Sequence, residues 1–277
     1  MIDLHLHTTA SDGRSTPREL VDRAATAGLT VIAVTDHDTT AASLEVRTLG
    51  RERGIEAVPG IEITAVENGR DVHVLGYFFD PSEPALEEFL ARQRVTRIAR
   101  AEAIAARLAS LGIPVDIARV VEDARRHGTR ALGRPQIARA MIAAGHVLDM
   151  REAFDKWLGS GAPAFVPRSG ASVEMVIGMV HRARGLVSLA HPGRTGIDDR
   201  IPALRDAGLD ALEVYHPDHT DAQRARYGLM AHTLGLLVTG GSDYHGDPSH
   251  GFEPGAATLP VDQWRRLEAA RHRHAAR

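Results

Sequence analysis

Short apolar segments alternate with longer amphipathic ones over most of the 277-residue chain. The run Val-Ile-Ala-Val at residues 31–34 contains no polar residue, which is typical of a strand buried on both faces. Asn68-Gly69 is a hairpin signal, so residues 71–79 are expected to fold back antiparallel to the strand before them. The other predicted strands lie at residues 2–7, 56–64, 186–190, 211–215 and 237–239.

Helix-forming segments separate these strands. Thr16-Pro17-Arg18-Glu19 has the pattern of a capping box with proline at the first helical position, and Gly28 closes that helix. Further helices of this kind are expected at residues 41–53, 173–184, 199–207 and 221–234. Strands that alternate with helices indicate a parallel α/β architecture.

The pattern changes in the middle of the chain. From about residue 83 to residue 158 strand signals vanish and alanine- and arginine-rich sequence takes over, which predicts helices such as 96–111 and 135–144. Glycine and proline interrupt this sequence at 112–114 and 159–163. We interpret residues 83–163 as a helical insertion subdomain, and residues 1–82 together with 164–277 as one barrel.

Polar side chains that can bind metal recur where the predicted strands end. They are His5, His7, Asp12, His37, Glu62, His73, His191, Asp243 and His245. Each follows or ends its strand and none precedes one, and in α/β barrels the active site sits at the carboxyl ends of the strands. With about seven strands, one short of the usual eight, the chain is expected to form a distorted (β/α)7 barrel.

The nine side chains together predict a polynuclear metal site. His5 and His7 are two residues apart on a strand, so both point to one face. Glu62 and Asp243 end buried strands, where a carboxylate needs a cation or hydrogen-bond donors. Taken singly, His37 also suits a turn and His73 a hydrogen-bonded core histidine. Ligands without sulfur suit manganese, iron, zinc or cobalt, and ligand type does not choose between these metals.

Composition limits the remaining possibilities. Cysteine is absent, which excludes disulfides and thiolate zinc sites. The sequence has neither an apolar run of about 20 residues nor a secretory signal, so we expect a cytoplasmic protein. Lys156 is the single lysine, and any Schiff-base or carboxylated-lysine mechanism would depend on it.

Positive charge is concentrated in the predicted insertion. Between Arg92 and Arg139 there are eleven arginines and four acidic residues, a net +7 in a chain whose total is −3. This distribution favours an anionic partner on one side of the molecule, and a solvated helix face explains the charges equally well.

The motifs around the nine residues resemble the PHP (polymerase and histidinol phosphatase) family. They are Asp3-Leu4-His5-Leu6-His7-Thr8, Ser11-Asp12-Gly13, Thr35-Asp36-His37-Asp38, Gly60-Ile61-Glu62, Val72-His73-Val74-Leu75-Gly76, Ala190-His191-Pro192-Gly193-Arg194 and Gly241-Ser242-Asp243-Tyr244-His245. The resemblance runs from residue 2 to about residue 245 in the family's order. The helical insertion is similar to that of the nucleoside 3′,5′-bisphosphate phosphatases and related 5′-to-3′ exoribonucleases.

The resemblance implies a cluster of two or three divalent ions, with manganese preferred. His5, His7, Glu62 and Asp243 would hold one ion, Glu62 would bridge to a second ion held with His73 and His191, and a third would lie between Asp12, His37 and His245. One segment departs from the family: His216-Pro217-Asp218-His219 follows the strand at 211–215 and does not match the pattern of one substrate.

These features predict a metal-dependent phosphoesterase that acts through a metal-activated hydroxide on small nucleotides or on RNA 5′ ends. Divalent ions lower the pKa of bound water toward about 7 and neutralise the phosphoryl group. Asp243 and Asp12 are the catalytic candidates, and Asp243 can both ligate a metal and relay a proton. For substrate binding we expect Arg194 and Arg134, because guanidinium groups complement phosphate, together with His216.

Three alternatives remain open at this point. They are a histidinol-phosphate-type phosphatase, a metal-dependent amidohydrolase, and a non-catalytic PHP module. Many amidohydrolases bridge two metals with a carboxylated lysine on a barrel strand, whereas Lys156 lies in the insertion. The expected partner is a small phosphorylated nucleotide or an RNA 5′ end, with no membrane and no obligate protein partner.

Overall fold

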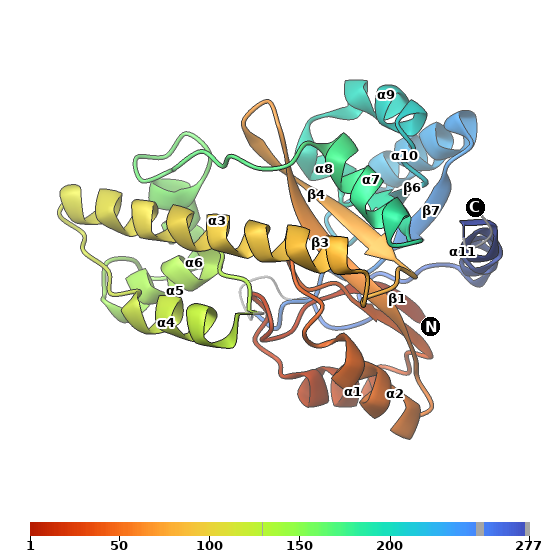
Figure 1. Cartoon of the computed structure of the whole chain (residues 1–277), viewed down its shortest axis with the longest axis horizontal. Coiled ribbons are helices and arrows are strands. Elements are labelled where there is room, and N and C mark those ends of the chain that lie inside the picture. The colour runs from red at the N-terminus through yellow and green to blue at the C-terminus, as the bar shows by residue number, and fades with distance from the viewer. Residues whose placement is uncertain (129, 248–251, 275–277) are drawn as a thin grey trace.

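Seven strands form one sheet in the order in which they occur along the chain. The computed structural model describes residues 1–128, 130–247 and 252–274 (Figure 1). Parallel pairing joins β1 (Ile2–Leu6), β2 (Val31–Val34) and β3 (Glu56–Glu67), and also β5 (Leu186–Leu189), β6 (Ala211–Tyr215) and β7 (Leu237–Gly240). Strand β4 (Arg70–Tyr77) lies between β3 and β5 and is antiparallel to both. Its pairing with β3 is the one that the Asn68-Gly69 turn predicts.

The two edges of the sheet meet beyond its last strand. Leu6 at the end of β1 forms a parallel bridge with Tyr244, and the backbone N–H of His7 donates to the Tyr244 carbonyl at 2.9 Å. The sheet is therefore nearly closed into a barrel, which confirms the predicted distorted (β/α)7 architecture.

Helices surround the barrel. The first, α1 (Pro17–Thr26), begins at the predicted capping box, in which Thr16 and Glu19 cap each other. The others are α2 (Ser43–Glu52), α7 (Val173–Arg182), α8 (Pro192–Thr195), the 3₁₀ helix η2 (Asp198–Arg200), α9 (Ile201–Asp206), α10 (Asp221–Leu234) and α11 (Val261–His274). Within the described ranges, no helix combines the length and the apolar sequence that crossing a bilayer requires.

Apolar side chains fill one end of the barrel and leave the other end to polar groups. Leu4, Ala33 and Tyr77 pack inside with Trp264 and Leu267 of α11. This cluster draws on the starts of parallel strands and on the end of the antiparallel β4. The opposite rim, where the parallel strands end, carries the histidines and carboxylates.

Two of the predicted ligands lie within strands rather than at their ends, contrary to expectation. Strand β3 continues to Glu67 instead of ending near residue 64, so Glu62 lies inside it. His73 is the fourth residue of β4. The physical reason is that β3 and β4 form a long antiparallel ribbon, and the early part of an antiparallel strand lies at the same rim as the ends of its parallel neighbours.

The segment after β4 is helical, as predicted. It contains α3 (Pro84–Ser110), α4 (Ala118–His127), α5 (Arg134–Ala143), α6 (Met150–Ala153) and the π-helix η1 (Phe154–Leu158), and Figure 1 shows these helices grouped on one side of the barrel. Helix α3 is longer than the predicted 96–111. Ile104, Leu108, Ile137, Met141 and Leu158 form part of a separate hydrophobic core in this region. The limits 83 and 163 for the insertion remain a prediction.

A buried ion cluster fastens the insertion to the barrel. Asp38, which follows His37, is fully buried and accepts hydrogen bonds from Arg97 of α3 and, at 3.3 Å, from Arg168 of the returning segment. Arg97 also donates to the Thr64 hydroxyl at 2.6 Å and to the Leu132 carbonyl at 3.2 Å. Burial alone would raise the pKa of Asp38, but the two guanidinium charges outweigh it and hold that pKa below its ordinary value.

We expect Asp38→Asn to lower the free energy of unfolding by about 3–5 kcal/mol, because it leaves Arg97 and Arg168 buried without their counter-charge. Urea denaturation of chelator-treated protein measures this without a contribution from metal release. The control is Glu88→Gln, which breaks the exposed pair with Arg92 and should cost less than about 1 kcal/mol. Equal losses in the two variants would contradict this account of the cluster.

Candidate metal centre and active site

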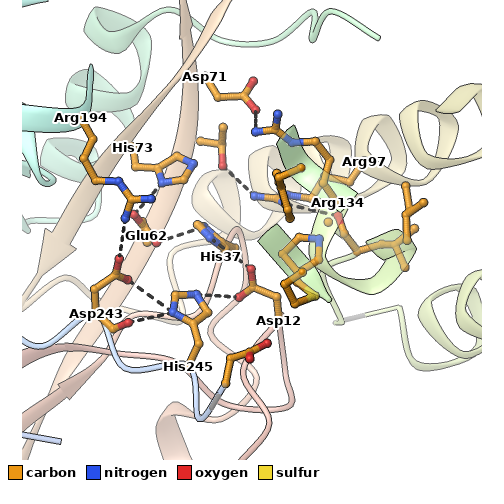
Figure 2. A pocket seen from close by; sticks show the side chains of 18 of the residues that line it. Asp12, His37, Glu62, Asp71, His73, Arg97, Arg134, Arg194, Asp243 and His245 are labelled. Atoms are coloured by element: carbon orange, nitrogen blue, oxygen red, sulfur yellow. Dashed lines mark hydrogen bonds and ion pairs between the residues drawn. The ribbon is translucent and has the colours of Figure 1, made fainter. Parts of the chain in front are cut away.

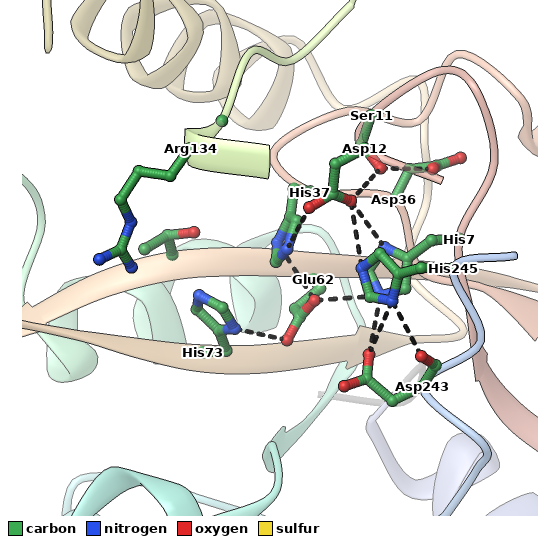
Figure 3. A network of polar contacts seen from close by, with 12 residues as sticks. His7, Ser11, Asp12, Asp36, His37, Glu62, His73, Arg134, Asp243 and His245 are labelled. Carbon is green, nitrogen blue, oxygen red and sulfur yellow. Dashed lines mark hydrogen bonds and ion pairs between the residues drawn. The ribbon is translucent and has the colours of Figure 1, made fainter. Parts of the chain in front are cut away.

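The nine side chains predicted as ligands meet at one rim of the barrel. Figure 3 shows His7, Asp12, His37, Glu62, His73, Asp243 and His245 of this set. Eight of them form three groups in which the ligand atoms lie within 4.8 Å of one another. The groups are His5, His7, Glu62 and Asp243; His7, Asp12, His37 and His245; and His37, Glu62 and His73. The ninth, His191, places Nε2 3.2 Å from Glu62 Oε1.

Glu62 lies at the centre of the cluster and is 1% exposed. Its Oε1 is 2.9 Å from His73 Nδ1 and 3.2 Å from His191 Nε2. Its Oε2 is 3.2 Å from His7 Nε2 and 3.1 Å from His37 Nδ1. The two oxygens therefore face two different sets of imidazoles, an arrangement that suits a carboxylate shared between two ions.

Asp12 occupies the loop after β1 and faces a second set of histidines. Its Oδ1 is 3.2 Å from His245 Nε2, and its Oδ2 is 3.7 Å from His37 Nε2. The loop turns back tightly at Gly13, where an added Cβ would lie 2.7 Å from the His7 carbonyl group. A side chain at this position would push Asp12 away from the cluster.

Asp243 follows β7 and faces the two histidines of β1. Its Oδ1 is 3.2 Å from His5 Nε2 and 3.3 Å from His7 Nε2. This close approach requires Gly241, because a Cβ there would lie 2.4 Å from the His5 backbone nitrogen. Asp243 itself has φ +51°, a conformation that costs free energy in a non-glycine residue and is found most often at functional sites.

Several buried polar atoms in the cluster have no hydrogen-bond partner among the described residues. They are His5 Nε2, His7 Nδ1, His7 Nε2, His37 Nδ1, Glu62 Oε2 and His191 Nδ1. Burying such groups without partners is costly, and imidazole nitrogens and carboxylate oxygens are the donors that divalent transition metals accept. The residues therefore fit a site for divalent metal ions.

The pKa shifts in the cluster reflect burial and the mutual attraction of its histidines and carboxylates. Burial would lower the pKa of His7, but its contacts with Asp243 and Glu62 raise that pKa to about 10. Burial would raise the pKa of Glu62, and the neighbouring histidines hold it well below its ordinary value. For His37 burial dominates and lowers the pKa to about 3, so this ring is neutral. A metal ion that binds here displaces protons from the cluster.

Sequence reasoning missed Glu213, a fully buried residue of β6. Its Oε1 accepts a hydrogen bond from His5 Nδ1 at 2.9 Å, and its Oε2 accepts one from the His191 backbone N–H at 2.7 Å. The first bond leaves His5 Nε2 free for a metal, which is the usual role of an outer carboxylate. Like Glu62, Glu213 is a carboxylate in a strand of otherwise apolar sequence, and this signal distinguishes it in the same way.

The segment after β6 lies against the same rim. His216 is 1% exposed and accepts a hydrogen bond from the Asp218 backbone N–H at Nδ1, so its Nε2 faces Asp243 Oδ2 at 3.4 Å as a donor. His219 accepts from the Gly193 backbone N–H at 3.2 Å and donates to the Val214 carbonyl at 3.0 Å. His216 thus contacts the metal rim, whereas His219 fastens helix α8 to β6.

Of the two predicted phosphate-binding arginines, Arg194 lies at the metal rim and Arg134 on the insertion (Figure 2). Arg194 is half-exposed, and its Nη1 is 3.7 Å from Asp243 Oδ2. Arg134 donates to Asp71 Oδ2 at 3.1 Å, and Arg100 binds the same oxygen at 2.9 Å. Its guanidinium also lies 5.7 Å from the centre of the Phe154 ring.

A cavity of about 580 Å³ joins the metal rim to the insertion. The rim contributes Asp12, Glu62, His191 and Asp243, among others. The insertion contributes arginines and an apolar wall: Arg97, Arg100, Arg134, Arg139, Ile104, Leu132, Ile137 and Phe154. Part of the net +7 charge of residues 92–139 is thus directed into the cavity, although Arg97, Arg100 and Arg134 are paired with Asp38 or Asp71.

Residues 3–185 match the model of the PHP domain. The chain is 35% identical to the 3′,5′-nucleoside bisphosphate phosphatase of Chromobacterium violaceum over 97% of this chain and 96% of that protein. It is 34% identical to the 5′-3′ exoribonuclease Rnm of Escherichia coli over 88% of this chain and 84% of that protein. A phosphoribosyl 1,2-cyclic phosphate 1,2-diphosphodiesterase of Eggerthella lenta is also 34% identical, with coverage of 88% and 94%.

Two solved structures share the whole fold. A protein of Bifidobacterium adolescentis, described as a candidate metal-dependent phosphoesterase, superimposes with a TM-score of 0.87 at 35% identity over 96% of this chain and 94% of that one. An amidohydrolase of Chromobacterium violaceum, solved with bound sulfate, gives 0.83 at 34% identity over 97% and 96%. The motifs, the barrel and these relatives agree, and the chain belongs to the PHP family of metal-dependent phosphoester hydrolases.

Proposed function

We propose that this phosphoesterase hydrolyses phosphate esters of small nucleotides, such as nucleoside 3′,5′-bisphosphates, or phosphate esters at RNA 5′ ends. The observation that carries the proposal is that one cavity combines the rim of candidate metal ligands on one side with arginines on the other. A nucleotide with two phosphates has anionic groups for both sides, and 580 Å³ lies within the range of about 300–1,000 Å³ usual for small-molecule sites. Relatives named for these two activities support it.

The ligand assignment is part of the proposal. His5, His7, Glu62 and Asp243 would hold one ion, and their grouping within 4.8 Å supports this set. Glu62 would share a second ion with His73 and His191, toward which its Oε1 is turned. Asp12, His37 and His245 would hold the third. We propose manganese as the physiological metal, with iron, zinc or cobalt as alternatives that the donor set also accepts.

The chain's own residues then orient the phosphate and move protons. Bound ions would activate water and neutralise charge on the phosphoryl group. Asp243 and Asp12 would be the catalytic carboxylates, and Asp243 is placed to accept a proton next to the phosphate. Its partners on the cavity side, Arg194 and the Nε2–H of His216, would donate hydrogen bonds to phosphate oxygens.

Arg134 would bind the part of the substrate that does not react. It extends from the first turn of α5 into the cavity and is held by Asp71 and by the Phe154 ring. Because its environment is mostly desolvated, a hydrogen bond to a second phosphate is stronger here than in water. This position separates recognition on the insertion from chemistry on the barrel.

An amidohydrolase activity is the second candidate, because one structural relative is described by that name. The lysine that many such enzymes use has no counterpart at this rim. Lys156 lies on η1, is exposed, and forms an ion pair with Glu152 at 2.7 Å. Glu62 already occupies the central position between the histidines, so we favour phosphate ester hydrolysis.

Glu213→Gln should lower metal affinity by about 10–100-fold, the usual effect of removing an outer carboxylate. A carboxylate accepts hydrogen bonds from both His5 and His191, whereas an amide has one acceptor oxygen and must break one bond. Elemental analysis and chelator competition measure this, and the unaltered protein should carry two or three ions. Glu174→Gln, at a half-exposed residue, is the control. Undiminished metal affinity in folded Glu213→Gln would refute the positioning role.

Arg134→Ala should raise the KM for a nucleoside 3′,5′-bisphosphate by about tenfold, because a charge-assisted hydrogen bond contributes about 1.5–3 kcal/mol and Asp71 already holds part of this charge. The KM for a small aryl phosphate should change less than about twofold. Steady-state kinetics on both substrates decides, with Arg126→Ala on the exposed face of α4 as the charge-matched control. An equal loss of activity toward both substrates would instead indicate that Arg134 acts in catalysis or folding.

Hydrolysis should occur at chain ends only. The cavity has room for about one nucleotide, and only 4% of residues are aromatic, so an extended base-stacking platform is not expected. A 5′-phosphorylated linear RNA should be degraded from its end, and a circular RNA of the same sequence should stay intact. Gel electrophoresis of both RNAs after incubation is the measurement, and a cleaved circle would rule out end-directed hydrolysis.

A further inference from the structure

Residues 216–219, which follow β6, make three contacts with the phosphate side of the cavity. His216 faces Asp243 Oδ2, and His219 accepts a hydrogen bond from the Gly193 backbone. Between them Asp218 places Oδ2 3.2 Å from Arg194 Nη1. Neither the metal ligands nor the proposed substrate contacts use the Asp218 carboxylate.

Arg194 is shared between two carboxylates. The same Nη1 that contacts Asp218 lies 3.7 Å from Asp243 Oδ2 (Figure 2). The Asp243 side chain is 13% exposed and lies in the metal cluster, whereas the Asp218 side chain is 40% exposed at the cavity edge. The Arg194 side chain, at 51% exposure, is free of tight packing and can exchange partners.

The backbone beneath Arg194 is fixed, so exchange involves the side chain alone. His219 contacts Gly193 closely: an added Cβ there would lie 2.9 Å from the His219 ring. Helix α8 begins with Pro192, and His191 before it is bonded to Glu213. Only rotation of the Arg194 side chain would therefore carry its guanidinium from Asp218 toward an anion in the cavity.

We propose that Asp218 is an internal competitor of phosphate for Arg194. This inference rests on the proposed function, in which Arg194 binds the reacting phosphate. A carboxylate and a phosphate present the same pair of anionic oxygens to a guanidinium. When inorganic phosphate leaves, Asp218 takes back Arg194, and this weakens product binding while the arginine remains available for the next substrate.

Asp218→Asn tests the competition, since it removes the charge and keeps the backbone N–H that bonds His216. We expect the inhibition constant of inorganic phosphate, measured against aryl phosphate hydrolysis by the metal-loaded enzyme, to fall about two- to fivefold. This range corresponds to an exposed ion pair. Asp221→Asn, a fully exposed charge-matched change on α10 outside the Arg194 contact, should leave the constant unchanged.

A double-mutant cycle with Arg194→Ala separates this contact from a general charge effect. In that background Asp218→Asn should have no effect on phosphate inhibition. An equal fall with and without Arg194, a fall with Asp221→Asn, or no fall at all would overturn the proposal. If Arg194→Ala alone leaves phosphate inhibition unchanged, the role of Arg194 in the proposed function fails. If it weakens inhibition while Asp218→Asn does nothing, only the competition fails.

Discussion

The cost of burying Glu62 in the middle of a strand governs the arrangement of the catalytic rim. An isolated carboxylate at 1% exposure would take up a proton rather than remain charged. Five imidazoles around its two oxygens reverse this preference and hold its pKa well below the ordinary value. The same histidines come from four parts of the sequence, so satisfying one charge draws together β1, the loop after β2, the β3–β4 ribbon and the end of β5.

The insertion depends on the same rim through Asp38. This residue follows His37 in sequence, and its carboxylate binds both the outgoing helix α3, through Arg97, and the returning segment, through Arg168. Thr64, two residues after Glu62, donates its backbone N–H to Asp38 and accepts from Arg97. The cavity is therefore bounded by two bodies that share hydrogen bonds next to the metal ligands, and its width cannot change without disturbing them.

Local signals were sufficient to predict most elements and the set of nine side chains that meet at the rim. The capping box at Thr16, the aliphatic run at 31–34 and the Asn68-Gly69 turn each depend on neighbouring residues alone, and the structure confirms all three. The length of the β3–β4 ribbon, and hence the position of His73 within β4, depends on pairing between strands. The contact of Arg97 with Asp38 joins residues 59 positions apart in the sequence, and that of Glu213 with His5 joins residues 208 positions apart. No local pattern encodes either contact.

Relatives of similar sequence are named for different reactions. Proteins at 34–35% identity are named for hydrolysis of a nucleoside bisphosphate, an RNA 5′ end and a cyclic sugar phosphate. The three named substrates share a phosphate group and differ in the group attached to it. In this chain that group would face the insertion, where Arg134 lies against Phe154 and beside Ile137 on the cavity wall. Under the proposed function, charge there would select a second phosphate and the apolar wall would limit the size of the attached group. Substrate choice could then change on the insertion while the residues of the barrel rim stay the same.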